Sequence, residues 1–234
     1  MRPNSERVES YFQRRAEHFD SLYDSEHPFQ YWINRLLRRG LYQRVLLTLR
    51  EMEPVRDFTV LDVGCGPGRN SVLFAQAGAS RVLGVDVSER MIQLAQAHAA
   101  RAGVADRCQF VHGDFHSCAF AEKFDFVVAL GLFDYLEDPR VTLERMVALA
   151  GYRVIASFPE TSLLRAPQRK LRYALRGCPV YFYRRPQLEA LAAGAGFPRF
   201  RLEPYASAGL LLVGEQDAAR AAVAVPEAHA ELAR

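Results

Sequence analysis

The amino-acid sequence predicts an α/β fold: a doubly wound sheet of seven mostly parallel strands whose last two strands form an antiparallel hairpin. Between residues 58 and 158, short β-branched and aromatic runs alternate with amphipathic segments, a rhythm typical of a parallel sheet with helices on both faces. A turn with three glycines at 64–68 joins the first run to the next amphipathic segment. Two further apolar runs, at 199–205 and 208–214, are joined by a turn short enough for antiparallel pairing.

The composition predicts a soluble globular protein with one sizeable core. The 234 residues are 50% hydrophobic and 24% charged, and no apolar run reaches the roughly 20 residues of a membrane span. Residues 1–6 lack the apolar centre of a signal peptide, so we expect a cytoplasmic protein. The net charge of +3 does not by itself indicate nucleic acid. Structural zinc and a disulfide framework are not expected, because the cysteines are scattered, at Cys65, Cys108, Cys118 and Cys178.

The first 56 residues predict an N-terminal helical cap. Apolar and aromatic residues recur at three- and four-residue steps over 5–26, as one face of a helix requires. This helix is either packed on the core or a lid that places Tyr11, His18 and Tyr23 over a site. A second amphipathic helix over 31–50 has arginines outside its apolar stripe and no acidic residue. Its basic face is either solvated or in contact with an anionic membrane surface.

Residues 57–214 predict the sheet and its helices. The first helix follows the glycine turn to about Ala77, and the second begins at Ser88, a helix N-cap, and ends before Gly103. Asp138-Pro139 begins a third helix, because proline is tolerated in the first turn, and a fourth follows Pro186. The strands are expected at 58–63, 81–86, 107–113, 124–130, 151–158, 199–205 and 208–214.

The alternation of strands and helices breaks after Pro159. Residues 161–185 contain seven basic residues and no acidic residue, and they end in the aromatic cluster Tyr181-Phe182-Tyr183. We expect this basic insertion to lie over one end of the sheet. Residues 215–234 are rich in alanine with mixed charge, which predicts a flexible tail.

Three acidic residues at strand ends accompany the glycine turn. Asp62 stands two residues before Gly64 and gives the pattern Asp-x-Gly-x-Gly-x-Gly, which disfavours a nicotinamide cofactor. Asp86 ends the second strand, where a carboxylate can bind both ribose hydroxyls. Asp114 ends the third strand, where it can bind the exocyclic amine of an adenine. Either residue alone can be a simple loop acid, but the carboxyl ends of these strands converge on one crevice.

The sequence resembles the class I S-adenosylmethionine-dependent methyltransferases over about 58–214. Val60-Leu-Asp-Val-Gly-Cys-Gly-Pro-Gly68 is similar to the first motif of this family, and Gly84-Val-Asp-Val-Ser88 with Met91 to the second. His112-Gly-Asp-Phe115 is similar to the adenine-side motif, and residues 124–139 to the fourth strand and active-site loop. The resemblance implies methyl transfer with S-adenosylmethionine as the cofactor.

The resemblance also implies how the cofactor is held. The three glycines would approach its methionine portion, Asp86 its ribose, and Asp114 with Phe115 its adenine, while an N-terminal aromatic helix would cover it. The residues expected to bind the cofactor are Tyr11, Asp62, Gly64, Cys65, Gly66, Gly68, Asp86, Val87, Met91, Asp114, Phe115 and Leu130.

Methyl transfer from a sulfonium mainly requires alignment of the acceptor and exclusion of water, although a hydroxyl acceptor gains from a general base. The expected catalytic residues are Asp134, in the loop beyond the fourth strand, and Tyr135. The tetrapyrrole and quinone methyltransferases, which the chain resembles more loosely, commonly have histidine at about this point, so a histidine mechanism is not carried over. In the alternative interpretation Asp134 is a helix-capping or loop residue and Tyr135 a core residue.

We expect a small-molecule acceptor, with methyl transfer to oxygen preferred over nitrogen. The arginines and aromatic residues of the insertion suit an anionic or amphipathic substrate, or they form a solvated basic surface. The alternatives are an RNA or protein methyltransferase, and a non-catalytic S-adenosylmethionine-binding or membrane-associated module. No metal site is expected, and the oligomeric state is open. The expected substrate contacts are Tyr23, Phe133, Arg172, Tyr181 and Tyr183.

Overall fold

The computed structural model describes residues 39–53, 57–161, 179–205 and 209–216, with side chains from residue 42 onward. The predicted helix over 5–26, most of the basic insertion and the predicted tail beyond residue 216 lie outside the described residues. Tyr11, Tyr23 and Arg172 also lie outside them. The division into cap, methyltransferase domain and tail therefore stays a prediction.

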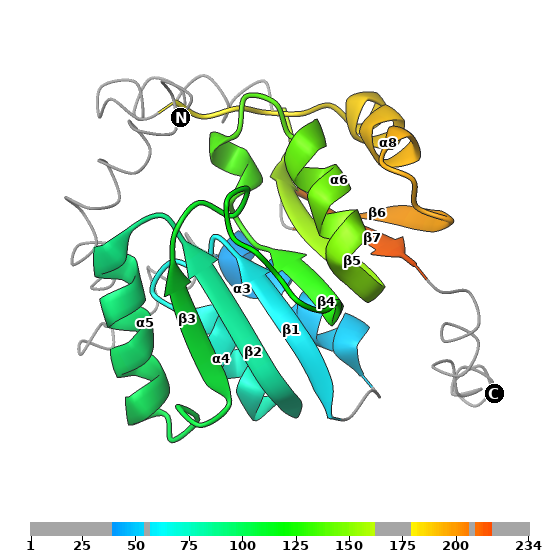
Figure 1. Cartoon of the computed structure of the whole chain (residues 1–234). Coiled ribbons are helices and arrows are strands. Elements are labelled where there is room, and N and C mark those ends of the chain that lie inside the picture. Colours follow the sequence, from blue (N-terminus) through cyan, green and yellow to red (C-terminus); the bar gives the residue numbers. More distant parts are fainter. Residues whose placement is uncertain (1–38, 54–56, 162–178, 206–208, 217–234) are drawn as a thin grey trace.

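The described chain alternates strands and helices as the sequence predicts (Figure 1). The helices are α3 (Arg39–Met52), α4 (Arg69–Gln76), α5 (Glu89–Arg101), α6 (Arg140–Leu149) and α8 (Arg185–Gly194), with a short 3-10 helix η1 (Phe133–Tyr135). The strands are β1 (Phe58–Val63), β2 (Ala79–Asp86), β3 (Cys108–His112), β4 (Phe124–Ala129), β5 (Ala150–Pro159), β6 (Arg199–Tyr205) and β7 (Gly209–Glu215).

The strands form one seven-stranded sheet in the order β3-β2-β1-β4-β5-β7-β6. Neighbours from β3 to β5 are parallel, whereas β7 pairs antiparallel with both β5 and β6. This confirms the predicted doubly wound, mostly parallel sheet with an antiparallel last hairpin. The chain runs outward from β1 to β3 and then crosses to β4 on the other side of β1. The strand order therefore reverses between β1 and β4, where ligands bind in folds of this kind.

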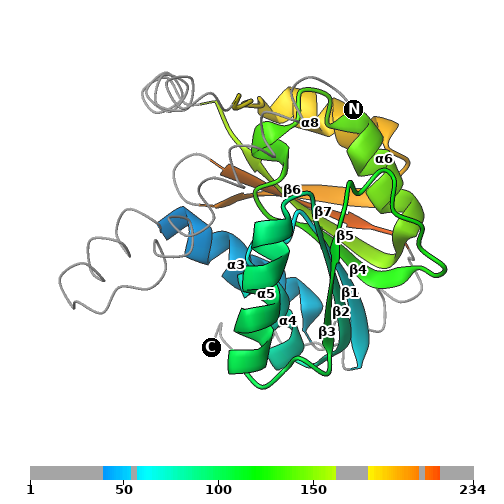
Figure 2. The same ribbon diagram turned by 60° about the vertical axis from the view of Figure 1, so that its left-hand side comes forward.

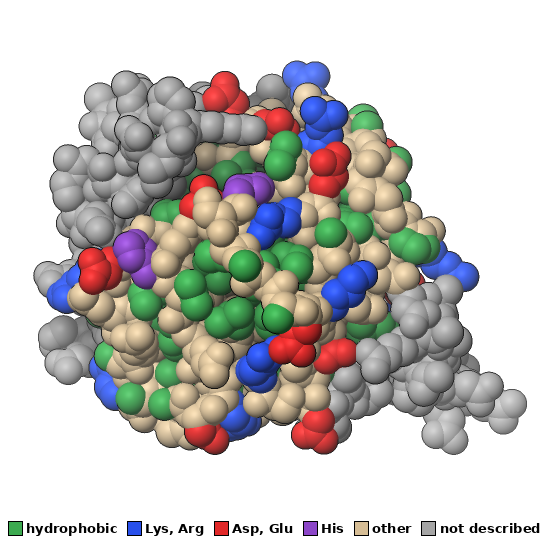
Figure 3. Space-filling model, in the orientation of Figure 1, with side chains coloured by type: hydrophobic (Ala, Val, Ile, Leu, Met, Phe, Trp, Pro, Cys, Tyr) green, Lys and Arg blue, Asp and Glu red, His purple; other side chains and the backbone are tan. Residues whose placement is uncertain are grey.

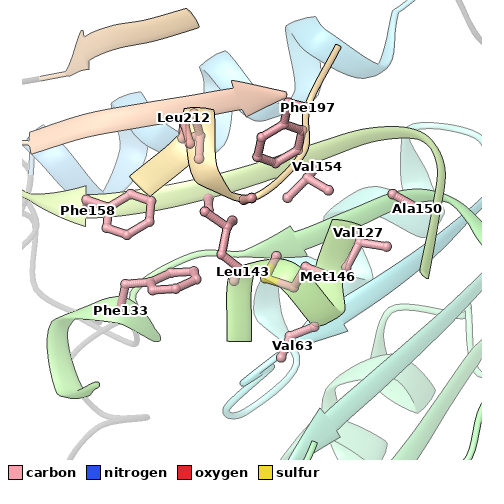
Figure 4. Close-up of a cluster of buried hydrophobic side chains, with 14 of the residues drawn as sticks. Val63, Val127, Phe133, Leu143, Met146, Ala150, Val154, Phe158, Phe197 and Leu212 are labelled. Carbon is pink, nitrogen blue, oxygen red and sulfur yellow. The ribbon is translucent and has the colours of Figure 1, made fainter. Parts of the chain in front are cut away.

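Two hydrophobic clusters, one on each face of the sheet, form the core. One lies beneath α6 and α8, and the other beneath α3, α4 and α5, which Figure 2 shows along the opposite face. In the first cluster, Leu143 and Met146 of α6 point at Val127 and Val154 of the sheet (Figure 4). The connection between β3 and β4 contains no helix. On the face of the molecule that is seen in the orientation of Figure 1, hydrophobic side chains gather in the middle and charged side chains lie around them (Figure 3).

Local capping residues explain where the helices begin. The Ser88 hydroxyl accepts a hydrogen bond from the Met91 N–H at 3.4 Å, which confirms Ser88 as the N-cap of α5. Asp138 Oδ1 accepts from the Arg140 N–H at 3.1 Å, so this carboxylate satisfies a free donor at the start of α6. The predicted element ends differ from the observed ones by one or two residues. Strand β2, for example, begins at Ala79 because that residue still pairs with Phe58 of β1.

None of the helices among the described residues has the length and apolar character that crossing a membrane requires.

Candidate functional site

The glycine turn between β1 and α4 is tied to strand β2 through its backbone. The N–H groups of Gly64 and Cys65 both donate to the Val85 carbonyl, at 2.8 and 3.1 Å. Gly64, Gly66 and Gly68 have φ angles of 69°, 54° and 72°, a region that residues with a Cβ rarely adopt. The turn therefore follows a backbone path that needs all three glycines, at the carboxyl end of β1.

Gly66 and Gly68 differ in their surroundings. A Cβ on Gly66 would meet no atom of the described residues within 4 Å, whereas a Cβ on Gly68 would lie 2.6 Å from the Cβ of Ala95. Gly68 is needed because α5 packs directly against it. Gly66 instead borders open space beside the first turn of α4, where backbone N–H groups favour a polar or anionic ligand.

The Asp86 carboxylate lies at the carboxyl end of β2, next to Gly66. Its Oδ2 accepts from the Gly66 N–H and its Oδ1 from the Ser88 N–H, both at 2.9 Å. Burial raises the pKa of Asp86, and these two hydrogen bonds lower it in part. Each carboxylate oxygen has two acceptor positions, so one position on each oxygen is left for a ligand with paired hydroxyls.

Asp62 lies behind the turn rather than in the open space. It is 1% exposed, and its Oδ2 accepts a hydrogen bond from the Ser71 hydroxyl at 2.6 Å. Because Ser71 belongs to α4, this bond braces β1 against the helix that follows the turn. A direct contact between Asp62 and a cofactor stays a prediction.

The residues predicted to bind adenine follow β3. Asp114 Oδ1 accepts from the His116 N–H at 2.9 Å, a contact that shapes this turn. Phe115 is buried, and the Arg145 guanidinium of α6 lies 5.2 Å from the centroid of its ring. His116 Nε2 lies 3.0 Å from the Thr142 hydroxyl, so α6 also engages this histidine.

Arg44 of α3 is a candidate that the sequence reasoning missed. A Cβ on Gly131 would lie 3.0 and 3.1 Å from the two terminal nitrogens of Arg44, so the guanidinium covers the carboxyl end of β4. The charge of Arg44 also lowers the pKa of the Asp62 carboxyl. Among the described residues, no carboxylate forms an ion pair with Arg44, and its buried Nε has no hydrogen-bond partner. A cation in this position can bind a carboxylate of a ligand.

The loop after β4 contains the predicted catalytic residues. It begins at Gly131, whose N–H donates to the Ser157 hydroxyl at 2.8 Å. Asp134 is 6% exposed, and Tyr135 is half-buried. The Tyr181 N–H donates to the Asp134 carbonyl at 2.9 Å, so the end of the basic insertion contacts this loop through its backbone.

Tyr183 and Phe133, both predicted substrate contacts, lie in the core. The Tyr183 hydroxyl hydrogen is shared between the carbonyls of Leu136, at 2.9 Å, and Phe133, at 3.2 Å. The Tyr183 ring packs edge-on against Phe158, with 5.3 Å between the ring centroids. The centroid of the Phe158 ring lies 4.3 Å from that of Phe133, and Figure 4 shows these two rings side by side. Both side chains are buried and pack beside the loop, and a contact of either with substrate stays a prediction.

The other predicted residues lie on the segments that follow the same strands. Cys65 is buried in the glycine turn, Val87 follows Asp86, Leu130 follows β4, and Met91 is buried in the first turn of α5. The structure thus brings the glycine turn, Asp86 and the start of the Asp134 loop to neighbouring strand ends. Among the described residues, no group of three or more His, Cys, Asp and Glu side chains could hold a metal ion.

Comparison with known proteins identifies this arrangement. Residues 60–150, from the first motif to the end of α6, match the family model of a methyltransferase domain. This match to a methyltransferase domain supports a class I S-adenosylmethionine-dependent methyltransferase. The matched segment contains the glycine turn, Asp86, Asp114 and Asp134, and S-adenosylmethionine is the methyl donor of this family.

Relatives of this methyltransferase domain include enzymes that are named for ubiquinone biosynthesis. The ubiquinone biosynthesis O-methyltransferase of Azorhizobium caulinodans is 33% identical over 159 residues, which are 63% of this chain and 62% of that protein. The protein of the same name from Pseudomonas fluorescens is 35% identical over 95 residues, 39% of this chain and 40% of that protein. The chain thus spans less than two thirds of the length of either relative.

Solved structures share the fold over most of the chain. The magnesium protoporphyrin IX methyltransferase of Synechocystis with bound SAH has a TM-score of 0.72 and 24% identity, and the match covers 90% of this chain and 98% of that one. A possible histamine N-methyltransferase of Thermotoga maritima has a TM-score of 0.66 and 18% identity, and that match covers 90% and 100%.

The described residues of the methyltransferase domain fit S-adenosylmethionine. The open space at Gly66 accepts a ligand that approaches the backbone, and Asp86 has acceptor positions beside it. Arg44 supplies a cation whose buried Nε has no partner among the described residues. A zwitterionic ligand that also carries ribose hydroxyls matches these three features.

Proposed function

We propose that this protein transfers the methyl group of S-adenosylmethionine to a hydroxyl of a small-molecule acceptor. The observation that carries the proposal is the meeting of three complementary groups at neighbouring strand ends. These are the open space at Gly66, the Asp86 carboxylate bonded to the Gly66 N–H, and the Arg44 guanidinium over Gly131.

The three groups would hold different parts of the cofactor. Arg44 lies where it can bind the α-carboxylate of the methionine portion, and Asp86 where it can accept from the ribose hydroxyls. Asp114 and Phe115 follow β3, two strands from β1, and are the residues that we propose for the adenine. When bound, the cofactor supplies an electrophilic methyl group on a sulfonium with a neutral leaving group. The chain's own residues bind it, orient it and exclude water.

Asp134 is the residue that we propose as general base toward the acceptor hydroxyl. Its loop follows the end of β4, directly after the glycine that Arg44 covers, and a buried carboxylate there can take the proton as the oxygen attacks. The oxygen acceptor is supported by relatives that are named O-methyltransferases. Tyr135, half-buried in the same 3-10 helix, is the second candidate.

The acceptor that we propose is a flat molecule of the quinone-precursor or porphyrin type. The support comes from the relatives and the solved structure described above, which are named for ubiquinone biosynthesis and for magnesium protoporphyrin IX. An anionic or amphipathic character of the acceptor, a contact with membranes and a cytoplasmic location stay predictions.

The experiment measures cofactor binding first and methyl transfer to the acceptor second. Calorimetry of the full chain with S-adenosylhomocysteine should show binding, and lack of binding by the wild type would refute the whole proposal. Transfer of labelled methyl groups should then be measured with a panel of phenolic quinone precursors and porphyrins. Asp134→Asn should lower turnover at least about a hundredfold with unchanged cofactor affinity. Asp138→Asn, four residues further along the chain, is the matched control and should have the turnover of the wild type. If the two variants had equal turnover, Asp134 would not be the general base.

A further inference from the structure

His98 of α5 contacts the glycine turn from behind. Its side chain is 8% exposed and lies on the inner face of the helix, as do Ala95 and Ala99. Its Nδ1 lies 2.7 Å from the carbonyl oxygen of Pro67, inside the turn. Because a carbonyl only accepts hydrogen bonds, the Nδ1 must carry the hydrogen, which fixes the donating nitrogen of this ring.

A backbone hydrogen bond can hold Pro67 only through its carbonyl, which lies at the centre of the glycine turn. Pro67 stands between Gly66 and Gly68, both with positive φ, and proline has no N–H of its own. The hydrogen-bond ladder of α4 begins one carbonyl later, where the Val72 N–H donates to the Gly68 carbonyl at 2.9 Å. The bond from His98 therefore ties down the centre of the turn.

A second contact of α5 reinforces this bond. Ala95 is three residues before His98, on the same face, and its Cβ is so close to Gly68 that no Cβ would fit there. Helix α5 thus touches two consecutive residues of the turn, one by packing and one by a hydrogen bond. At Gly66, by contrast, an added Cβ would meet no atom of the described residues within 4 Å.

We propose that His98 is a positioning residue for the cofactor, which acts through Pro67 by holding the glycine turn in its ligand-binding conformation. A turn with three glycines loses much conformational freedom when it is ordered. A turn that is already ordered before the ligand arrives binds it more tightly, because binding then causes no further loss of conformational entropy in the turn. The nature of the ligand rests on the proposed function, whereas the tethering of the turn does not.

The experiment compares three variants of the full chain by calorimetry with S-adenosylhomocysteine. His98→Leu keeps an apolar side chain but loses the donor, and it should weaken binding about tenfold. His98→Asn places an amide N–H at the position of Nδ1 and should restore affinity to within about threefold of wild type. Val104→Ala, a buried residue of the same side of the sheet that is not part of the turn, controls for loss of stability and should bind as wild type does.

Two further measurements distinguish positioning from a general loss of stability. Without ligand, the amides of Gly66 and Gly68 should exchange with solvent faster in His98→Leu than in Val104→Ala. The affinity of His98→Leu for 5′-methylthioadenosine, which lacks the amino-acid portion, should fall less than its affinity for S-adenosylhomocysteine.

Three outcomes would overturn the inference: wild-type affinity in His98→Leu, no rescue by His98→Asn, or unchanged amide exchange in the turn. Failure of the wild type to bind S-adenosylhomocysteine at all refutes the proposed function instead. The exchange measurement then still decides whether His98 tethers the turn.

Discussion

The Ser71 hydroxyl lies 2.6 Å from Asp62 Oδ2, and both residues are buried. The pKa of Asp62 is raised from 3.8 to about 7, mainly by burial and in part by the charge of Asp86, while the Ser71 hydrogen bond and the charge of Arg44 act in the opposite direction. Between about pH 4 and about pH 7 the folded chain therefore keeps a proton that the unfolded chain releases. This group's contribution to the free energy of unfolding is complete at low pH and is lost as the pH rises to about 7.

Asp62→Asn should remove that pH dependence. Asparagine still accepts a hydrogen bond from Ser71 but stays neutral. The variant should therefore lose less stability than the wild type between about pH 4 and about pH 7. At about pH 8 it should be the more stable of the two proteins. Urea unfolding across this range measures both effects. The same slope in variant and wild type would show that Asp62 titrates normally in the folded protein.

Gly66→Ala tests the open space at the glycine turn. The φ of 54° makes an alanine strained there, at about 1 kcal/mol, but its Cβ meets no atom of the described residues. The variant should fold, yet bind S-adenosylhomocysteine far more weakly because the methyl group projects into the ligand space. Calorimetry gives the affinity and urea unfolding the stability.

Gly103→Ala is the matched control for this substitution. Gly103 has a φ of 67° and equally open surroundings, but it follows α5, away from the turn. It should show the same small loss of stability with unchanged affinity. Equal affinity in the two variants would place the ligand away from Gly66.

The fold and the glycine turn were predictable because their signals are local. The alternation of strands and helices sets the sheet, and the three glycines with Asp86 are placed together by strand order alone. Ser88 was predictable as an N-cap because the capping oxygen and the helix start lie in adjacent residues.

Arg44 and His98 could not be found in this way, since their roles depend on contacts between distant elements. Arg44 is one of several arginines on a basic helix, and no periodicity indicates which of them reaches Gly131. His98 is one polar residue on the inner face of α5, and only the packing of α5 on the turn shows its partner. The sequence also does not show that Phe133 and Tyr183, both predicted substrate contacts, are buried, because their burial depends on packing against Phe158 of β5.

Tyr183→Phe should loosen the loop that carries Asp134. The substitution keeps the ring against Phe158 but leaves the carbonyls of Phe133 and Leu136 without the hydroxyl hydrogen. Loss of a buried hydrogen bond costs about 1–2 kcal/mol of unfolding free energy, and turnover should fall while cofactor affinity holds. Urea unfolding with a methyl-transfer assay measures this. Tyr42→Phe, at an exposed tyrosine of α3, should change neither quantity.

The attachment of α3 to the sheet depends on a buried ion pair. Glu51 Oε2 lies 3.2 Å from Arg153 Nη1 with both side chains 10% exposed, and Glu51 also pairs with Arg201. Glu51→Ala leaves Arg153 with the backbone carbonyl of residue 51, at 2.8 Å, and the Glu215 carboxylate, at 3.3 Å, so the loss of one buried charge partner should cost about 3 kcal/mol. Glu203→Ala removes one of the three carboxylates that pair with the partly exposed Arg201, the others being Glu51 and Glu215, and should cost less than about 1 kcal/mol. Because α3 carries Arg44, Glu51→Ala should also weaken binding of S-adenosylhomocysteine, which Glu203→Ala should leave intact. Calorimetry and urea unfolding of both variants test this, and a similar small loss in both would mean that water, rather than Glu51, satisfies Arg153.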